Sequence, residues 1–272
     1  MAAAANLGRA VGLAARTSSG DREAFVSLYS PDFDGLFDLA LRTVREREAA
    51  GAVVRAGLEG AWDSFREEGA PYAVGAWLHV LVRDAALARP AAKRRLPAVV
   101  VEREALEYTQ VDTSRLSDPS IAFDQELIEL VWDAAAALDR DGYSLLDLHL
   151  RHDLSVDELA CELEVPREQL AWQLSRLCTA LEHSVASTLL ATRARHNCDE
   201  LDAALSSNGM SVARSVQRHV RECASCRETK RRFPSATEIL GSLAPLQPPA
   251  SLRERIAKLF LAQGRRHARK LR

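Results

Sequence analysis

Lysine, methionine and long apolar runs are all scarce in this sequence. Four of its 272 residues are lysine, whereas arginine, alanine, leucine and valine are abundant, a bias typical of a GC-rich genome. No apolar run approaches the ~20 residues that cross a bilayer, so we expect no membrane-spanning helix. Met1–Ala5 is apolar but short and has no basic lead, so we expect no secretory signal peptide.

Cysteine, glycine and proline are also few. Three of the five cysteines gather between residues 198 and 226, which does not resemble the disulfide framework of a small secreted domain. We therefore expect a protein of the reducing cytoplasm. The 13 glycines and 10 prolines predict loops and turns but no long disordered tract. An apolar content of 47 % can support real cores, and the length predicts two or three domains.

The residue patterns of common enzyme sites are missing as well. The sequence has no glycine-rich phosphate loop, no Ser/His/Asp set and no pair of catalytic carboxylates expected on one helix face. His149 and His152 lie three residues apart, but no nearby cysteine completes a metal site. We therefore do not expect an enzyme.

The net charge of −2 conceals a strong asymmetry along the chain. Residues 1–95 carry 13 basic and 12 acidic side chains, residues 96–197 carry 8 and 19, and residues 198–272 carry 15 and 7. The middle is thus at −11 and the last part at +8. Because opposite charges attract, we expect an intramolecular contact between the acidic segment 121–195 and the basic segment 241–272.

The spacing Cys198-x20-His219-x3-Cys223-x2-Cys226 predicts a metal site. His219 and Cys223 are four residues apart and share a face if they lie on a helix, and Cys226 follows three residues later. Three thiolates and an imidazole form a typical tetrahedral zinc shell. His196 is an alternative first ligand. A structural zinc site is the first interpretation, a zinc-linked redox switch the second, and buried small residues with a surface histidine the third.

Apolar residues recur at helical spacing in most of the chain, so the sequence predicts an all-α fold. We expect a helical domain at 1–95, in which Asp21 opens the first helix, and a linker at 96–120. A second helical domain at 121–195 would begin with a helix from Ile121 to Leu138. Asp141-Gly142 would separate this helix from the next one. A small zinc-binding helical domain at 196–240 would contain two short helices around Ser207–Gly209. The rest, 241–272, would be a proline-containing loop and a basic amphipathic tail.

The second domain carries a helix-turn-helix pattern. Ser155 and Glu158 form a capping box at the start of a short helix, Glu164-Val165 is the turn, and Pro166 is expected at the first position of a longer helix. A left-handed conformation at Glu164 would cost about 1 kcal/mol. Cys161 and Cys178 stand at positions typical of the core.

Residues 20–187 resemble an extracytoplasmic-function sigma factor, a small bacterial transcription initiation factor of the sigma-70 family. The resemblance is carried by Gly20-Asp21-Arg22-Glu23-Ala24-Phe25, Val53-Val54 with Ala61-Trp62, Ala76-Trp77-Leu78 with Arg83, and Leu154–Ala160 followed by Val165-Pro166. The His-x3-Cys-x2-Cys segment is similar to the zinc-binding anti-sigma fold, which here follows the sigma-like part on one chain.

The resemblance implies a division of labour between the domains. The first domain would bind the RNA polymerase core through Val53, Val54, Leu58 and Trp62. Promoter DNA would be contacted by residues of both domains, namely Trp77, Arg83, Arg167, Gln169, Trp172, Gln173 and Arg176. The zinc domain would restrain or tune both sigma-like domains. The apolar Leu252–Phe260 face of the tail is expected to pack on the sigma-like domains, and the alternative is a solvated amphipathic end.

Several residues depart from the family pattern in one direction. Gly51, Ala52 and Ala56 stand where the family has carboxylates that meet the polymerase, and Asp84 stands where it has asparagine. Ala171, Gln173 and Cys178 fill basic positions of its recognition helix, although phosphate contacts supply much of DNA affinity. The alternative is therefore a degenerate sigma-like scaffold that acts through protein contacts.

Overall fold

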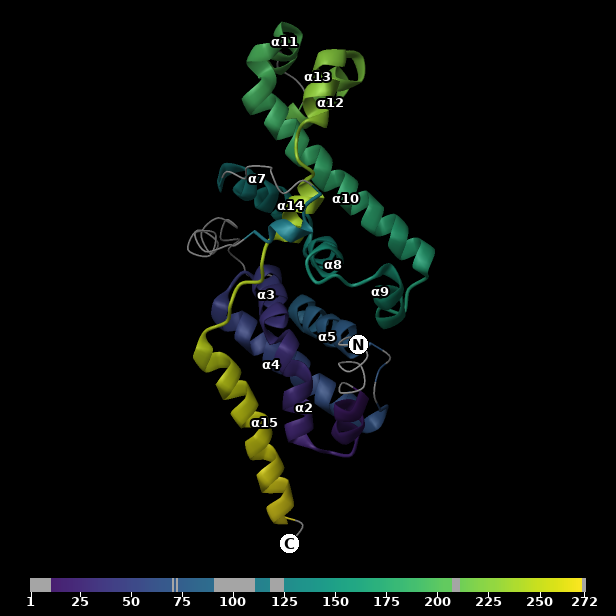
Figure 1. The fold of residues 1–272 in the computed structure, drawn as a ribbon, viewed down its shortest axis with the longest axis vertical. Coiled ribbons are helices and arrows are strands. Elements are labelled where there is room, and N and C mark those ends of the chain that lie inside the picture. The colour runs from purple at the N-terminus through teal and green to yellow at the C-terminus, as the bar shows by residue number, and fades with distance from the viewer. Residues whose placement is uncertain are drawn as a thin grey trace. The chain divides into compact units, whose positions relative to one another are not determined.

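The computed structural model describes residues 11–69, 71, 73–90, 111–117, 125–206 and 211–270, with side chains described up to residue 263. The regular elements in this part of the chain are all helical, and Val111 and Leu243 form an isolated antiparallel bridge (Figure 1). The predicted all-α class is therefore confirmed. None of the described helices is both long and apolar enough to cross a membrane.

The chain folds into two compact units that are discontinuous in sequence. Unit 1 contains Met1–Val101, Leu154–Arg167 and Pro245–Arg272, and unit 2 contains Glu102–Asp153 and Glu168–Ala244. These units cut across the domains expected from the sequence, because the short helix after Ser155 groups with unit 1, where it packs against the helix Val74–Ala88. The expected domain boundaries stay a prediction.

Unit 1 consists of helices from the first part of the chain, one short helix from its middle and the last helix. Its elements are α2 (Arg22–Tyr29), η1 (Ser30–Asp32), α3 (Phe33–Val44), α4 (Arg47–Glu67), α5 (Val74–Ala88), α9 (Val156–Glu162) and α15 (Ala250–Lys270). Asp21 caps α2 as expected, since its carboxylate accepts hydrogen bonds from the backbone N–H groups of Glu23 and Ala24. Helices α4 and α5 approach so closely at Gly57 that a Cβ there would lie 2.7 Å from Val82 Cγ2, so this crossing requires glycine.

A buried ion pair anchors the segment that enters α15. Asp38 and Arg42 lie one turn apart on α3 with their side chains at most 2 % exposed, and Arg42 Nε donates to Asp38 Oδ1 over 2.9 Å. The same oxygen accepts the backbone N–H of Leu246 at 2.9 Å. The extended segment before α15 is thereby fixed to the core of unit 1.

Helix α15 packs against α2 within unit 1 (Figure 1). Leu252, Ile256 and Phe260 are buried, and the Phe260 ring lies 5.2 Å from the Phe25 ring in a T-shaped arrangement. Arg22 donates to the Phe260 carbonyl and to Gln263 Oε1 at 3.4 and 3.0 Å. The Leu252–Phe260 face therefore packs on α2 within unit 1.

Unit 2 joins a helical core to the small cysteine-bearing helices. Its elements are η2 (Thr113–Arg115), α7 (Gln125–Ala136), α8 (Arg140–Leu150), α10 (Arg167–Leu189), the π-helical turn η3 (Leu190–Ala194), η4 (Arg195–Asn197), α11 (Asp199–Ser206), α12 (Val212–Glu222), α13 (Ala224–Arg231) and α14 (Ala236–Ser242). Trp132, Leu146, Leu181 and Ile239 are central members of its main core.

Two carboxylates organise that core, Asp147, which is buried, and Glu182, which is half-buried. Asp147 accepts a hydrogen bond from Arg151 Nη1 at 3.0 Å, and Arg151 Nη2 donates to the carbonyls of Leu243 and Ala244 at 3.0 and 3.2 Å. Glu182 on α10 accepts the backbone N–H groups of Ala236 and Thr237 at 3.1 and 2.9 Å. It therefore caps the N-terminus of α14, whose four first N–H groups have no partner within the helix.

Two expected helix boundaries are shifted. The break between the two helices lies at residues 137–139 and not at Asp141-Gly142, because α8 already begins at Arg140, where the Asp139 carboxylate caps it by accepting the Gly142 N–H at 2.7 Å. Pro166 immediately precedes α10, whose first residue is Arg167. The Ser155–Glu158 capping box and the left-handed Glu164, with φ of 53°, are both confirmed.

Some expectations fall on residues outside the described part of the chain. These are most of the linker 96–120, the start of the helix expected from Ile121 and the loop Ser207–Gly209. The side chains of Arg265–Arg272 are likewise outside it.

Candidate metal centre

The four predicted ligands come from the ends of three short helices in unit 2. Cys198 stands between η4 and α11, and its carbonyl accepts the Asp202 N–H at 3.0 Å. His219 lies in the last turn of α12, and Cys223 is the extended residue where α12 ends and α13 begins. Cys226 lies in the first turn of α13. Each ligand is thus held by backbone that a helix terminus already orders.

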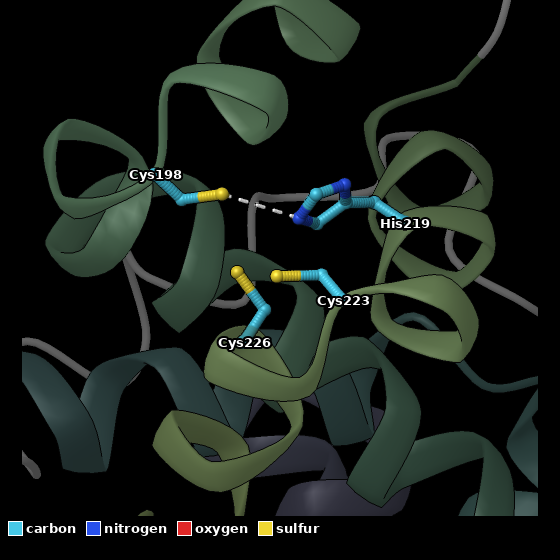
Figure 2. A group of neighbouring side chains, drawn as sticks. All are labelled: Cys198, His219, Cys223 and Cys226. Carbon is cyan, nitrogen blue, oxygen red and sulfur yellow. Dashed lines mark hydrogen bonds between the residues drawn. The ribbon is translucent and has the colours of Figure 1, made fainter.

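The structure brings these four side chains together (Figure 2). One nitrogen or sulfur atom from each residue lies within 4.8 Å of the others, and Cys198 Sγ is 3.3 Å from His219 Nε2. His219 and Cys226 are buried, while Cys198 and Cys223 are half-buried. His196 is exposed and is not part of this cluster. The alternative first ligand is therefore not supported by the geometry.

The two neighbouring thiols of the cluster differ in pKa. The backbone N–H of Cys226 donates to the Cys223 sulfur and, with the Ser225 N–H and the other thiols, holds the pKa of Cys223 below its ordinary value. Burial raises the pKa of Cys226 to about 12, and the hydrogen bonds and charges of Cys198 and Cys223 act in the same direction. Thiolates this close repel each other unless a cation lies between them.

The geometry and the donor set fit zinc. In a tetrahedral site with Zn–S of about 2.3 Å and Zn–N of about 2.0 Å, neighbouring ligand atoms lie roughly 3.5 Å apart. The distance of 3.3 Å between Cys198 Sγ and His219 Nε2 is close to this value. Three sulfurs and one imidazole nitrogen converge from different helices in Figure 2. The cluster can therefore hold a metal ion, and four protein ligands would leave no open position for substrate.

A small hydrophobic core surrounds the cluster. Leu190, Ala194, Leu201 and Val216 are buried together with Cys226. The π-helical turn η3 ends α10 and carries two of these residues inward. Arg195 Nε donates to Asp202 at 2.6 Å and fixes η4 against α11. Sequence reasoning overlooked these supporting residues, although their apolar spacing on α11 and α12 is a signal that could have found them.

The residues expected to read promoter DNA from the second domain lie on the surface. Arg167, Gln169, Trp172, Gln173 and Arg176 on α10 are exposed, with Trp172 59 % exposed. The Arg176 guanidinium stacks over the Trp172 ring at 4.7 Å, and Arg167 Nε donates to Asp157 at 2.5 Å. One of the two arginines is thus already paired with a carboxylate.

The two DNA-contact residues expected in the first domain are less accessible. Trp77 is half-buried, and its ring stands edge-on to Phe65 at 5.1 Å. The Arg83 side chain is 9 % exposed and donates to Asp84 Oδ1 at 2.9 Å. Both side chains therefore contribute to the packing of unit 1.

The four residues expected to bind polymerase are buried in unit 1. Val53, Val54, Leu58 and Trp62 are at most 5 % exposed, and the Trp62 ring packs against Phe25 and under the Arg22 guanidinium. Hydrophobic periodicity could not tell a buried face from a docking face, because both are apolar.

The two remaining cysteines do not behave alike. Cys161, expected in the core, is exposed, because the short helix α9 buries Leu159 and turns Cys161 outward. Cys178 is half-buried, and burial raises the pKa of its thiol. Neither belongs to the metal cluster.

The expected charge pairing between 121–195 and 241–272 stays a prediction. Cations of α15 with described partners pair elsewhere, Arg253 with Asp34 at 2.5 Å and Lys258 with Glu254 at 3.0 Å.

Comparison with known proteins adds no name to these features. No family model matches this chain, and neither a curated protein nor a solved structure matches it.

Proposed function

We propose that this protein is a sigma-factor-like transcription regulator that binds RNA polymerase core and promoter DNA and is restrained by its own C-terminal region. The observation that carries the proposal is the docking of α15 on α2, beside Trp62 of α4, which belongs to the segment whose sequence resembles the polymerase-binding part of sigma factors. A helix in this place competes with any partner that needs the same face.

The metal centre supports the proposal as a structural element. Zinc held by Cys198, His219, Cys223 and Cys226 would lock α11, α12 and α13 into one body, because a structural site supplies folding free energy that these short helices lack alone. Zinc supplies no reaction step here. A peroxide that takes up two electrons and is reduced while two of these thiolates form a disulfide would release the zinc and unfold this body.

The helix-turn-helix pattern supports the DNA-binding part of the proposal. The capping box at Ser155, the tight turn at Glu164 and the long helix α10 follow in the expected order. Trp172 and Arg176 present an aromatic ring and a guanidinium on the exposed face of α10, and both groups can contact base edges or phosphates.

A second candidate function is a sigma-like scaffold that acts through protein contacts without ordinary promoter recognition. The burial of Arg83 and the pairing of Arg167 with Asp157 favour it, because both remove positive charge that phosphates would need. The charge of −11 over residues 96–197 favours it as well.

Capture of purified RNA polymerase core distinguishes these functions. The full chain is compared with the Leu252→Ala/Phe260→Ala double variant, which removes two buried anchors of α15 at about 2–5 kcal/mol each. We expect the double variant to retain several-fold more polymerase than the unaltered chain, because α15 no longer covers α2. The matched control Leu259→Ala changes an exposed leucine of the same helix and should leave capture unchanged.

The outcome separates three cases. Stronger capture together with retention of promoter DNA supports the regulator. Capture of polymerase without any promoter retention supports the scaffold. If neither the unaltered chain nor the double variant binds polymerase, the sigma-like proposal is wrong.

A further inference from the structure

Unit 1 carries an open groove between α4 and α15. It has a volume of about 830 Å³ and lies on the side of α4 that faces α15. Its α4 wall comes from one face of the helix, from Arg47 to Arg55, and its α15 wall runs from Leu252 to Ala262. The groove is separate from the metal centre. It includes Gly51 and Ala52, which stand where the resembled family has carboxylates that meet the polymerase, so an occupant of the groove would be a further ligand for a face that the proposed function also involves.

The floor of the groove is apolar. It is formed by Gly51, Ala52, Leu252, Ile256 and Leu259. Leu259 is 45 % exposed, although the neighbouring Phe260 is 2 % exposed. At Gly51 a Cβ would lie 3.1 Å from Leu252 Cδ1, so the small residues on α4 keep the floor open and bring α15 close.

The rim of the groove is basic. Four cationic side chains line it, namely Arg47, Arg55, Arg255 and Lys258, against one carboxylate, Glu48. Neither Arg47 nor Arg255 has an ion-pair partner among the described residues. Arg55 and Lys258 pair with Glu59 and Glu254 within their own helices at 3.8 and 3.0 Å. Such exposed pairs contribute little and exchange readily, so all four cations can turn to a ligand.

The length of the groove fits a short helix. From Arg47 to Arg55 the α4 wall spans about 12 Å, and from Leu252 to Ala262 the α15 wall spans about 15 Å, at 1.5 Å per residue. A docked amphipathic helix would place two or three apolar side chains, at positions i, i+3 or i+4 and i+7, on such a floor. Carboxylates flanking that stripe would meet the basic rim.

We propose that the α4–α15 groove binds an acidic amphipathic helix of a partner protein, with apolar side chains on Leu252, Ile256 and Leu259 and carboxylates toward Arg47 and Arg255. The charge of the rim selects this partner, because a basic or neutral helix would leave the two arginines unpaired. The α15 helix thus serves as one wall of a binding site as well as a cover for α2.

A pair of labelled peptides tests the proposal on the full-length protein. The first is a helix of about 15 residues with three leucines spaced by one turn and glutamates on both sides, long enough to be partly helical alone. The second has lysine in place of every glutamate. Fluorescence anisotropy should show binding of the glutamate peptide at least about tenfold tighter than that of the lysine peptide, and weaker binding at high salt.

Variants locate the binding. Arg255→Glu and Leu259→Asp should each weaken binding of the glutamate peptide by about tenfold or more. The first replaces a cation of the basic rim, and the second places a charge on the apolar floor. Arg66→Glu, at an exposed arginine of α4 outside the groove, is the matched control and should bind like the unaltered chain. Arg255 is exposed, so its replacement leaves the fold intact and keeps the test decisive.

Three results would overturn the proposal. The first is equal affinity for the two peptides, or no binding of either. The second is binding that neither Arg255→Glu nor Leu259→Asp weakens. The third is a concentration-dependent dimer that Leu259→Asp abolishes, which would assign the groove to a second copy of this chain. Polymerase capture is measured separately, so failure of either proposal is recognised without the other.

Discussion

Phe260 on α15 stands edge-on to Phe25 on α2, with 5.2 Å between the ring centroids, although the two residues lie near opposite ends of the sequence. Phe25 is fully buried, and its ring also contacts Tyr29, Trp62 and Phe65. The C-terminal helix therefore completes an aromatic cluster of the first helices, and it is not a solvated tail.

The first prediction concerns that ring pair. Phe260→Ala should lower the free energy of α15 docking by about 3–5 kcal/mol, because a large buried side chain is lost and a cavity remains. Limited trypsin digestion of the full chain should then cut within α15 much faster, at Arg253, Arg255 and Lys258. Leu259→Ala is the control, and similar digestion rates for the two variants would contradict the docking.

The second prediction concerns the metal. The purified chain should carry about one zinc ion, and Cys223→Ser should lose it, because three ligands bind far more weakly than four. The segment 198–231 should unfold with it, since binding and folding are coupled. Elemental analysis and amide hydrogen exchange measure both effects.

Cys161→Ser provides the reference for this metal experiment, because Cys161 is exposed and outside the cluster. The Cys161→Ser protein should keep both its zinc ion and the protection of the segment 198–231 against amide hydrogen exchange. Zinc in the Cys223→Ser protein at the stoichiometry of the unaltered chain would rule out the assigned ligand set.

The third prediction concerns acid stability through Glu182. Burial raises the pKa of Glu182, but hydrogen bonds from Ser235, Thr237 and Ala236 outweigh it, so the pKa lies below its ordinary value. A carboxylate with a lowered folded pKa stabilises the fold above its unfolded pKa, and this contribution is lost as pH falls through the folded pKa. The free energy of unfolding of unit 2 should therefore fall with acid below about pH 4.5.

Glu182→Gln should flatten that acid dependence, because glutamine does not titrate, and should cost stability at pH 7, because its amide caps α14 less well than a carboxylate. Urea unfolding between pH 3 and pH 7 measures both slopes. Glu200→Gln, at an exposed carboxylate of the same unit, should keep the slope of the unaltered protein. Identical slopes for Glu182→Gln and Glu200→Gln would refute the role of Glu182.

The fourth prediction concerns the left-handed turn before α10. Glu164 has φ of 53°, a conformation that costs a side-chain-bearing residue about 1 kcal/mol and costs glycine almost nothing. Glu164→Gly should therefore stabilise the chain by up to ~1 kcal/mol in thermal unfolding. Glu162→Gly, two residues earlier in α9, should instead destabilise it by a similar amount. Destabilisation by Glu164→Gly would mean that its side chain has a role beyond the turn.

Two helix caps were read correctly from the sequence. The cap at Asp21 and the capping box at Ser155 depend on residues a few positions apart, and the structure has both. The break expected at Asp141-Gly142 lies earlier, at residues 137–139. Asp139 begins α8 by capping Gly142, and a cap outweighs the low helix propensity of one glycine in the first turn.

Distant contacts were less predictable, because apolar spacing shows that a face is buried without showing what buries it. Val53, Val54 and Leu58 were assigned to a partner and lie in the core of unit 1. The basic rim of the groove was missed, because Arg47 and Arg255 belong to segments far apart in sequence that meet through α4 and α15.

The amino-acid sequence by itself determined the all-α class, the main helix caps and the ligand spacing His219-x3-Cys223-x2-Cys226, because helical periodicity and ligand spacing are short-range properties. Only the tertiary structure decided that Cys198, and not His196, joins the cluster, and that α15 packs on α2. Those outcomes depend on which helix ends converge and on which aromatic rings share a core. Such convergence follows from the packing of the whole chain, and no local pattern encodes it.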